Sequence, residues 1–292
     1  NTGSRTSQED GWAYISEGEI SSVEPVAGQE GTRVTIKGSS LFGGSEGVES
    51  VAFAGIPAFI DTQTDTEVVA VVFALPDDQA AELSDIVLTG ASGVVIRKVN
   101  AWTYSRINVV GPESGQRSTT VEITGVALAA GGSTIVGVEL AGVPVLEIVS
   151  QTAESIEVTA RGHVVTEHTI GSVVLISDNG QRVSLLDGFT YNVAGAINSV
   201  LPINGQQGTA VTIEGVDLFG HGNSITQVFL ADVEVTEIVE STNTKVVVIA
   251  ALAPESVGDI VLVSDSGATV VLADGTARNE LVDGLWTYDP VA

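Results

Sequence analysis

The chain has 292 residues, enough for about two domains of ordinary size. Its 37 aspartate and glutamate residues against 11 lysine and arginine residues give a formal net charge of -26, which excludes nucleic acids as partners because phosphate binding requires a basic surface. Cysteine is absent, which excludes disulfides and thiolate metal sites, and no apolar run is long enough for insertion into a membrane.

Residues 1–19 contain Asp10-Gly11-Trp12-Ala13-Tyr14, which is similar to stretches that occur later at Trp102, Phe189 and Trp286. We interpret it as the last strand of a preceding repeat or as a strand donated to a neighbouring molecule, with disorder as the third alternative. We hypothesise that Trp12 and Tyr14 complete a sheet of another protomer or of an upstream repeat.

One pattern then occurs three times, beginning at Ile20, Ile107 and Ile197. Each copy has a proline after a short apolar strand, a glycine-bearing turn, and an alternating strand that ends in glycine. We expect these prolines and glycines to define turns. They are Pro25, Gly28 and Gly38, then Pro112, Gly115 and Gly125, then Pro202, Gly205 and Gly215. The interval of roughly 90 residues is typical of a small β-sandwich and too long for a solenoid coil. We therefore predict three domains, at 20–105, 106–195 and 196–292.

Short runs rich in Val, Ile and Thr predict seven strands in the first repeat. They are Ile20–Val23, Arg33–Lys37, Ser50–Phe53, Pro57–Ile60, Glu67–Phe73, Asp85–Thr89 and Val94–Val99. Seven short strands of this kind are expected to form two facing sheets. Asx-x-Gly turns at 178–180 and 265–267 predict hairpins between strands 173–177 and 182–186, and between 260–264 and 269–272.

Each repeat ends on aromatic residues at matching positions: Trp102 and Tyr104, Phe189 and Tyr191, Trp286 and Tyr288. Flat aromatic rings can stack on sugars, but recurrence at one strand position in every repeat favours packing at the end of each sandwich.

Local signatures of catalysis such as Gly-x-Ser-x-Gly or His-Glu-x-x-His do not occur, so we predict that the chain is not an enzyme. His163, Glu167 and His168 form a polar cluster, which we interpret as an exposed loop rather than a metal site. Asp61, Asp65 and Glu67 could supply oxygen ligands to calcium, but they do not have EF-hand spacing. We predict no cofactor, with calcium left as the alternative.

The pattern Ile-x-x-Val-x-Pro-x-x-Gly-x-x-Gly-Thr-x-Val-Thr-Ile-x-Gly, present from Ile20 and again from Ile197, resembles the IPT/TIG domain. The second repeat departs from it at Ser118. The resemblance implies an all-β chain of three tandem immunoglobulin-like (IPT/TIG) β-sandwiches in an extended rod. Similar domains occur in cell-surface receptors, in microbial surface proteins, beside starch-acting enzymes and in some transcription factors, so the fold does not fix the function.

Tandem repeats most resemble the extracellular setting. The sequence therefore favours a non-enzymatic structural protein at the cell surface or outside the cell, a subunit or fragment of a surface fibre, appendage or long repeat array. Its partners would be further copies or neighbouring repeats, bound through domain ends and edge strands. The alternative is an adhesin or a carbohydrate-binding accessory module that contacts a surface protein or a glycan.

Overall fold

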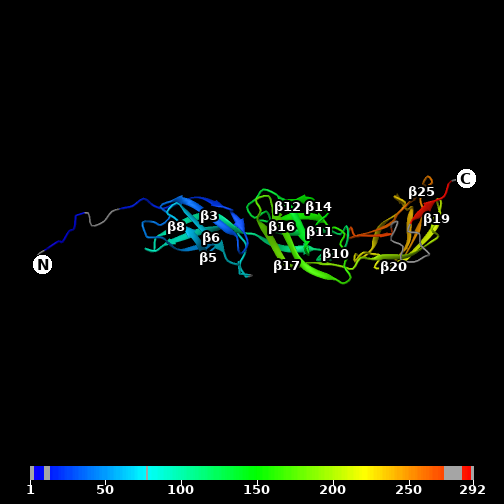
Figure 1. Cartoon of the computed structure of the whole chain (residues 1–292), viewed down its shortest axis with the longest axis horizontal. Coiled ribbons are helices and arrows are strands. Elements are labelled where there is room, and N and C mark those ends of the chain that lie inside the picture. The colour runs from blue at the N-terminus through cyan, green and yellow to red at the C-terminus, as the bar shows by residue number, and fades with distance from the viewer. Residues whose placement is uncertain (1–2, 10–13, 77, 273–284, 291–292) are drawn as a thin grey trace. The chain divides into compact units, whose positions relative to one another are not determined.

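The computed structural model describes residues 3–9, 14–76, 78–272 and 285–290 (Figure 1). Within these ranges the regular structure consists of strands β1 to β28, and no helix occurs. The predicted all-β class is therefore confirmed. The chain packs into two compact units, the first formed by residues 1–106, 129–133 and 178–183, and the second by 107–128, 134–177 and 184–292. The division into three domains stays a prediction, and the three repeats are called the first, second and third segments below.

The first segment forms one sheet of eight strands in the order β1-β3-β6-β5-β4-β7-β8-β2. Its strands are β1 (Glu19–Glu24), β2 (Ala27–Gly28), β3 (Arg33–Ser39), β4 (Val48–Phe53), β5 (Ile56–Gln63), β6 (Glu67–Val72), β7 (Ser84–Gly90) and β8 (Val95–Tyr104). All seven predicted strands are confirmed. Val34 and Ile36, predicted to share a face of β3, are both fully buried.

The two facing sheets expected in the first segment are joined into one hydrogen-bonded sheet by β5. β5 pairs with β4 through Ile56–Ala58 and with β6 through Ala58–Gln63, so one unbroken strand belongs to both halves.

The second segment has two sheets, β10-β17-β16-β12-β13 and β14-β15-β11-β9. Its strands are β9 (Arg106–Gly111), β10 (Ser114–Gly115), β11 (Thr120–Val126), β12 (Ile135–Leu140), β13 (Val143–Pro144), β14 (Glu147–Gln151), β15 (Ser155–Thr159), β16 (Thr169–Ser177) and β17 (Arg182–Tyr191). Here two short strands, β13 and β14, stand where the first segment has β5. The predicted hairpin strands are confirmed within β16 and β17.

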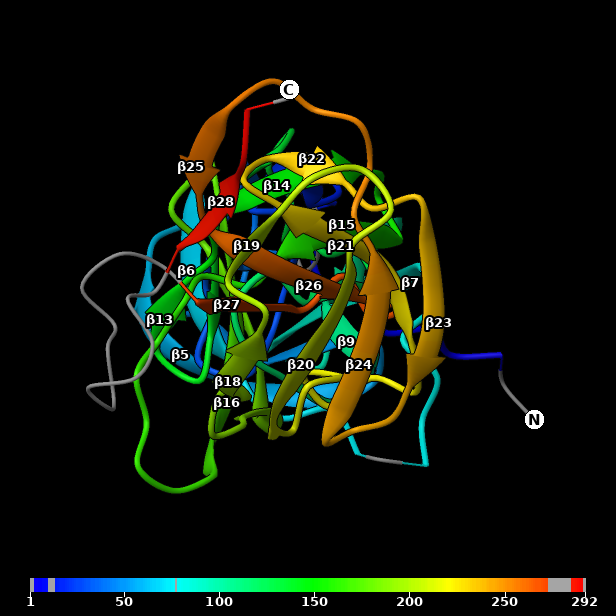
Figure 2. The ribbon, with the colours of Figure 1, turned by 90° about the vertical axis from the view of Figure 1, so that its right-hand side faces the viewer.

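The described residues of the third segment form three sheets, β18-β20-β24-β23, β22-β21-β26-β27 and β19-β28-β25. Its strands are β18 (Ala196–Leu201), β19 (Asn204–Gly205), β20 (Ala210–Val216), β21 (Ile225–Leu230), β22 (Val233–Glu234), β23 (Glu237–Ser241), β24 (Lys245–Ile249), β25 (Ser256–Gly258), β26 (Ile260–Ser264), β27 (Thr269–Leu272) and β28 (Trp286–Tyr288). Figure 2 faces this segment and shows β20, β24 and β23 beside one another. Val211, Ile213 and Leu262 lie in its core together with Trp286.

A two-residue strand pairs in parallel with the last strand of every segment: β2 with β8, β10 with β17, and β19 with β28. Each short strand follows a cis peptide bond before Pro25, Pro112 or Pro202. The chain thus leaves one edge of the fold and reaches another within a few residues, a feature that hydrophobic periodicity did not predict.

The six repeat glycines do not have the predicted role in turns, because all of them lie in strands: Gly28, Gly38, Gly115, Gly125, Gly205 and Gly215. At Gly28, Gly115 and Gly205 a Cβ atom would collide with the side chain of the threonine four residues later. At Gly38 and Gly215 it would collide with the backbone oxygen of Glu19 or Ala196. Glycine is required at these five positions because neighbouring groups approach closely.

Candidate assembly surfaces

The six repeat-end aromatic side chains all lie in the core: Trp102, Tyr104, Phe189, Tyr191, Trp286 and Tyr288. Trp102 packs edge-on against Phe53 and Tyr104, with ring centroids 4.9 Å and 5.7 Å away. Burial raises the pKa of Tyr104 to about 12 and likewise that of Tyr191, where nearby Arg161 lowers it slightly. A sugar ring could not reach these side chains.

The hypothesis of a donated strand at Trp12 and Tyr14 stays a prediction. Trp12 lies outside the described residues. Tyr14 lies outside any strand, and its side chain is 95% exposed.

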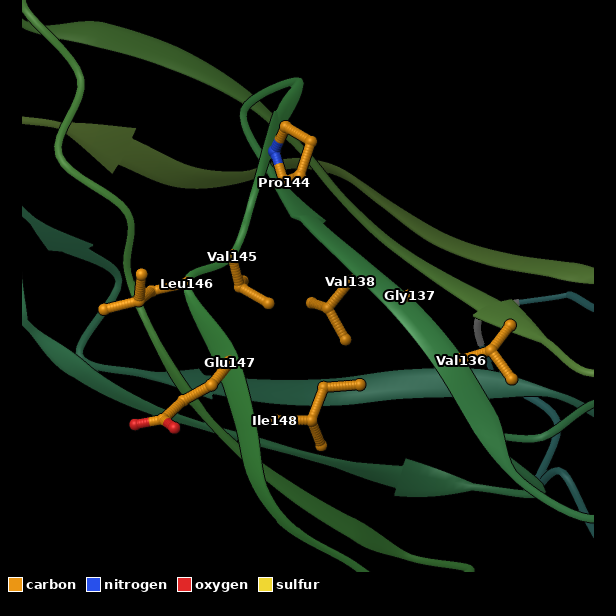
Figure 3. Close-up of a pocket in the computed structure, with 8 residues that line it drawn as sticks. All are labelled: Val136, Gly137, Val138, Pro144, Val145, Leu146, Glu147 and Ile148. Atoms are coloured by element: carbon orange, nitrogen blue, oxygen red, sulfur yellow. The ribbon is translucent and has the colours of Figure 1, made fainter.

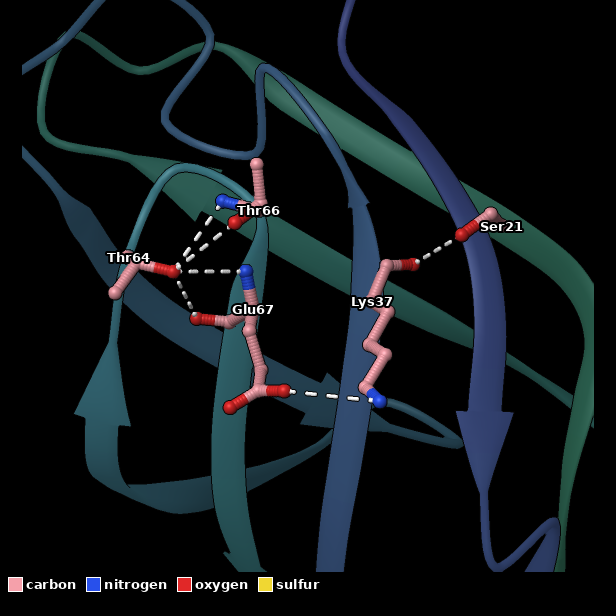
Figure 4. A network of polar contacts seen from close by, with 5 residues as sticks. All are labelled: Ser21, Lys37, Thr64, Thr66 and Glu67. Atoms are coloured by element: carbon pink, nitrogen blue, oxygen red, sulfur yellow. Dashed lines mark hydrogen bonds and ion pairs between the residues drawn. The ribbon is translucent and has the colours of Figure 1, made fainter.

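The three acidic residues considered for calcium have separate partners. Asp61 forms an ion pair with Arg33. Asp65 accepts a hydrogen bond from the backbone N–H of Phe42 at 2.9 Å. Glu67 faces Lys37 at 3.9 Å, and its backbone N–H donates to Thr64 Oγ1 at 3.0 Å (Figure 4). Among the described residues, no group of three or more histidine, aspartate or glutamate side chains could hold a metal ion.

The histidines also do not gather around one point. The ring of His163 contacts the ring of Tyr191, with centroids 5.5 Å apart. His168 Nδ1 lies 2.9 Å from Asn192 Oδ1, and its ring meets that of His221 at 5.8 Å. Sequence proximity of His163 and His168 therefore did not indicate their contacts.

A shallow groove of about 330 Å³ lies in the second segment, between β12 on one side and the stretch from the end of β13 into β14 on the other (Figure 3). Val138, Val145 and Ile148 point into it, while Val136 and Leu146 are exposed beside it. Both β13 and β14 are terminal strands of their sheets, so each has one side to which a further strand could add.

The strands β5, β14 and β23 each have a bulge, and the exposed residue at the bulge differs between the three segments. Asp61 on β5, Val149 on β14 and Val239 on β23 lie at corresponding register shifts against β6, β15 and β24. Asp61 is ion-paired, whereas Val149 and Val239 are apolar and 52% and 56% exposed. Exposed apolar edges of this kind favour strand addition.

A junction inside the second unit joins the second and third segments, and its centre is Gln116. The side chain of Gln116 is buried; its Nε2 donates to the backbone oxygen of Thr269 and its Oε1 accepts from the N–H of Gly195, both at 2.9 Å. Thr120 N–H donates to Ser266 O at 2.9 Å, and Thr269 N–H to Arg117 O at 3.1 Å.

Sequence reasoning missed Gln116 because a polar residue in a turn leaves no hydrophobic pattern. A signal was nevertheless present: a glutamine directly follows the glycine in every repeat, at Gln29, Gln116 and Gln206. Packing within a single repeat does not require a glutamine at this position. Its recurrence therefore indicates a contact between repeats.

In a comparison with known protein families, one family profile matches parts of the chain. The sequence profile described as the IPT/TIG domain matches residues 19–102 and 196–276. A comparison with curated proteins finds no match. No helix of the described residues is long and apolar enough to cross a membrane.

Several solved structures are similar to the chain in part. The Plexin A4 extracellular region is 18% identical, with a TM-score of 0.42 over 94% of this chain and 24% of that one. SGBP-B of the Bacteroides ovatus mixed-linkage glucan utilization locus, solved with a mixed-linkage heptasaccharide, is 12% identical, with a TM-score of 0.27 over 90% and 65%. Three N-terminal domains of the bacteriophage RB49 outer capsid protein Hoc are 10% identical, with a TM-score of 0.26 over 94% and 99%. The chain thus spans only about a quarter of the length of the plexin and just under two thirds of the glucan-locus protein.

Proposed function

The chain belongs to the IPT/TIG domain family, and from this premise we propose that it is a non-enzymatic extracellular structural protein whose segments assemble through their ends and edge strands into a fibre, appendage or longer array. The observation that carries the proposal is the junction at Gln116. There, within the chain, one segment end contacts another through main-chain hydrogen bonds and one buried side chain, which supports the proposal.

The edge strands supply a second means of association. β14 and β23 end their sheets and carry exposed Val149 and Val239, so an added strand would gain both main-chain hydrogen bonds and apolar burial. The net charge of -26 keeps such a surface soluble until specific contacts form.

The alternative, an adhesin or glycan-binding module, has less support from the described residues. Aromatic platforms are the usual means of holding a sugar ring, and the repeat-end aromatic residues are buried. Among the described phenylalanine and tyrosine residues, those with substantially exposed side chains are Tyr14, Phe59 and Phe73.

The test is the association state of the full chain over a wide range of concentrations and salt, followed by light scattering and negative-stain microscopy. We expect concentration-dependent oligomers, favoured by salt because salt screens the repulsion between acidic copies. A chain that stays monomeric throughout, yet binds a defined oligosaccharide on a glycan array, would replace this proposal with the alternative.

A further inference from the structure

The turn that carries Gln206 in the third segment is built like the turn that carries Gln116. The backbone N–H of Gln116 donates to Thr119 Oγ1 at 3.0 Å, and that of Gln206 donates to Thr209 Oγ1 at 3.1 Å. The strand before each turn residue pairs in parallel with the last strand of its segment, Gly115 beside Tyr191 and Gly205 beside Tyr288. The two glutamines are therefore presented by the same local structure.

Their surroundings differ. Gln116 is 2% exposed and bridges Thr269 and Gly195, whereas Gln206 is exposed. Around the Gln206 turn lie three exposed apolar side chains, Leu201, Ile203 and Leu252. Their counterparts near the Gln116 turn are Gly111, Glu113 and Gly162. The uncovered turn thus has an apolar rim that the covered turn lacks, as expected of a surface that binds a partner.

The surface that receives Gln116 also has an uncovered counterpart. In the third segment it is the hairpin 264–269, in which Gly267 N–H donates to Ser264 O at 3.0 Å and Ser264 N–H to Ala268 O at 2.9 Å. In the first segment the hairpin 90–95 has the same two bonds, Gly93 N–H to Gly90 O and Gly90 N–H to Val94 O, both at 2.8 Å. The two hairpins therefore share this backbone hydrogen bonding.

Only one of these hairpins is covered. A Cβ atom on Gly267 would lie 2.8 Å from Thr120 Oγ1 and 3.1 Å from Ser118 O, whereas one on Gly93 would meet open space. Gly18 occupies the position in the first segment that Gly195 has in the third. Gly18 packs closely against the backbone oxygen of Ser40, as Gly195 does against that of Asp217.

We propose that the Gln206 turn of one copy binds the 90–95 hairpin and Gly18 of a second copy, as the Gln116 turn binds the 264–269 hairpin and Gly195 within the chain. Gln206 Nε2 donates to the backbone oxygen of Val95, and Gln206 Oε1 accepts from the N–H of Gly18. Leu252 and its apolar neighbours pack near exposed Val95. The two surfaces are different, so the contact is heterologous and can repeat from copy to copy without closing.

This inference rests on the proposed assembly function and names the partner and the residues of one contact in it. Two variants test it in sedimentation experiments on the full chain. Gln206→Ala removes both side-chain hydrogen bonds and is expected to weaken association roughly tenfold or more. Gln207→Ala, at the next exposed position, is the matched control and is expected to associate like the unaltered chain.

A mixing experiment separates this contact from association through edge strands. Leu252→Lys blocks the turn surface, and Val95→Glu blocks the hairpin surface, so each variant alone is expected to lose the end-to-end contact. Mixed together, they retain one intact pair of surfaces, so through this contact they should form end-to-end dimers and nothing longer. If both variants assemble like the unaltered chain, the contact proposed here is wrong while assembly through edges stands. If the unaltered chain itself does not associate, the assembly function fails as well.

Cross-linking gives an independent readout because the chain has no cysteine of its own. Ser118 Oγ and Thr269 Oγ1 lie 3.1 Å apart in the existing junction, and their counterparts are Gly208 and Val95. The double variant Gly208→Cys with Val95→Cys should oxidise to a ladder of linked copies, and each single variant should give no product beyond a dimer. A double variant that forms no ladder under conditions in which the chain associates would overturn the proposal.

Discussion

The first and second segments have the same sequence pattern but differ where the chain passes from one half of the fold to the other. In the first segment this passage is β5, a single strand from Ile56 to Gln63. In the second it is split into β13 and β14, and a groove lies between this stretch and β12. The second passage has one extra residue, because Pro144 to Gln151 is one residue longer than Pro57 to Gln63. In both, the proline pairs with the preceding strand and the glutamine accepts a backbone hydrogen bond.

The exposed side chains at the bulges of β5 and β14 are also different. The bulge of β5 carries Asp61, which is held by Arg33, and an ion-paired charge discourages the addition of another strand. The bulge of β14 carries exposed Val149, an apolar side chain that favours the addition of another strand. One added residue and one changed side chain thus turn a protected edge into a candidate contact surface.

The largest predicted effect tests whether the two segments share one kind of core. Trp102→Ala and Phe189→Ala each remove a fully buried aromatic side chain and are expected to lower the free energy of unfolding by about 3–5 kcal/mol. Urea unfolding followed by circular dichroism would measure this. A loss below about 1 kcal/mol for either variant would show that the aromatic side chain is not part of the core described here.

Alkaline pH gives the second prediction. Burial raises the pKa of Tyr104 and Tyr191 from 10.0 to about 12, so the folded chain holds these protons more tightly than the unfolded chain. The contribution of these protonated tyrosines to the free energy of unfolding is fully present below pH 10. It is lost as the pH rises through about 12, on the order of 2 kcal/mol for each tyrosine.

Phenylalanine variants provide the control for this pH dependence. Neither hydroxyl has a hydrogen-bond partner within the described structure, so Tyr104→Phe and Tyr191→Phe should leave stability at pH 7 unchanged or slightly raised. Each should retain more stability than the unaltered chain between pH 10 and 12. Identical alkaline unfolding curves for variant and unaltered chain would show that the hydroxyl is not buried in solution.

Much of this fold follows from the sequence, for reasons that particular residues illustrate. Alternation of Val34 and Ile36 predicts β3 because one face of the strand is buried, and the recurrence of Trp102, Phe189 and Trp286 indicates packing. β2 was missed because two residues have no periodicity. The single sheet of the first segment was missed because it depends on a residue count between Pro57 and Gln63 rather than on hydrophobicity. Gln116 was missed because its role lies between segments.

A smaller effect concerns the glutamine side chains at the ends of β5 and β14, each of which accepts a backbone hydrogen bond. The backbone N–H of Val48 donates to Gln63 Oε1 at 2.6 Å, and that of Ile135 donates to Gln151 Oε1 at 2.7 Å. Gln63→Ala and Gln151→Ala should each cost about 1–2 kcal/mol, since a partly buried backbone donor loses its acceptor. Hydrogen exchange at Val48 or Ile135 should accelerate in the matching variant only. Unchanged exchange at both amides would mean that the edges are held by other contacts.

The smallest effect on stability, and the sharpest test of the comparison, comes from exchanging the two bulge residues. Asp61→Val removes an exposed ion pair and Val149→Asp adds an exposed charge, so neither should change the free energy of unfolding by more than about 1 kcal/mol. Their effects on association should be opposite. Val149→Asp makes the second edge resemble the first and should weaken lateral association, while Asp61→Val removes the charge that protects β5 and should strengthen it. Val149→Thr keeps the β-branched shape without a charge, so it should behave like the unaltered chain if charge is what protects the edge. Equal association of all four proteins in sedimentation would show that the bulge residue does not control strand addition, and the difference between the two segments would then be one of backbone continuity alone.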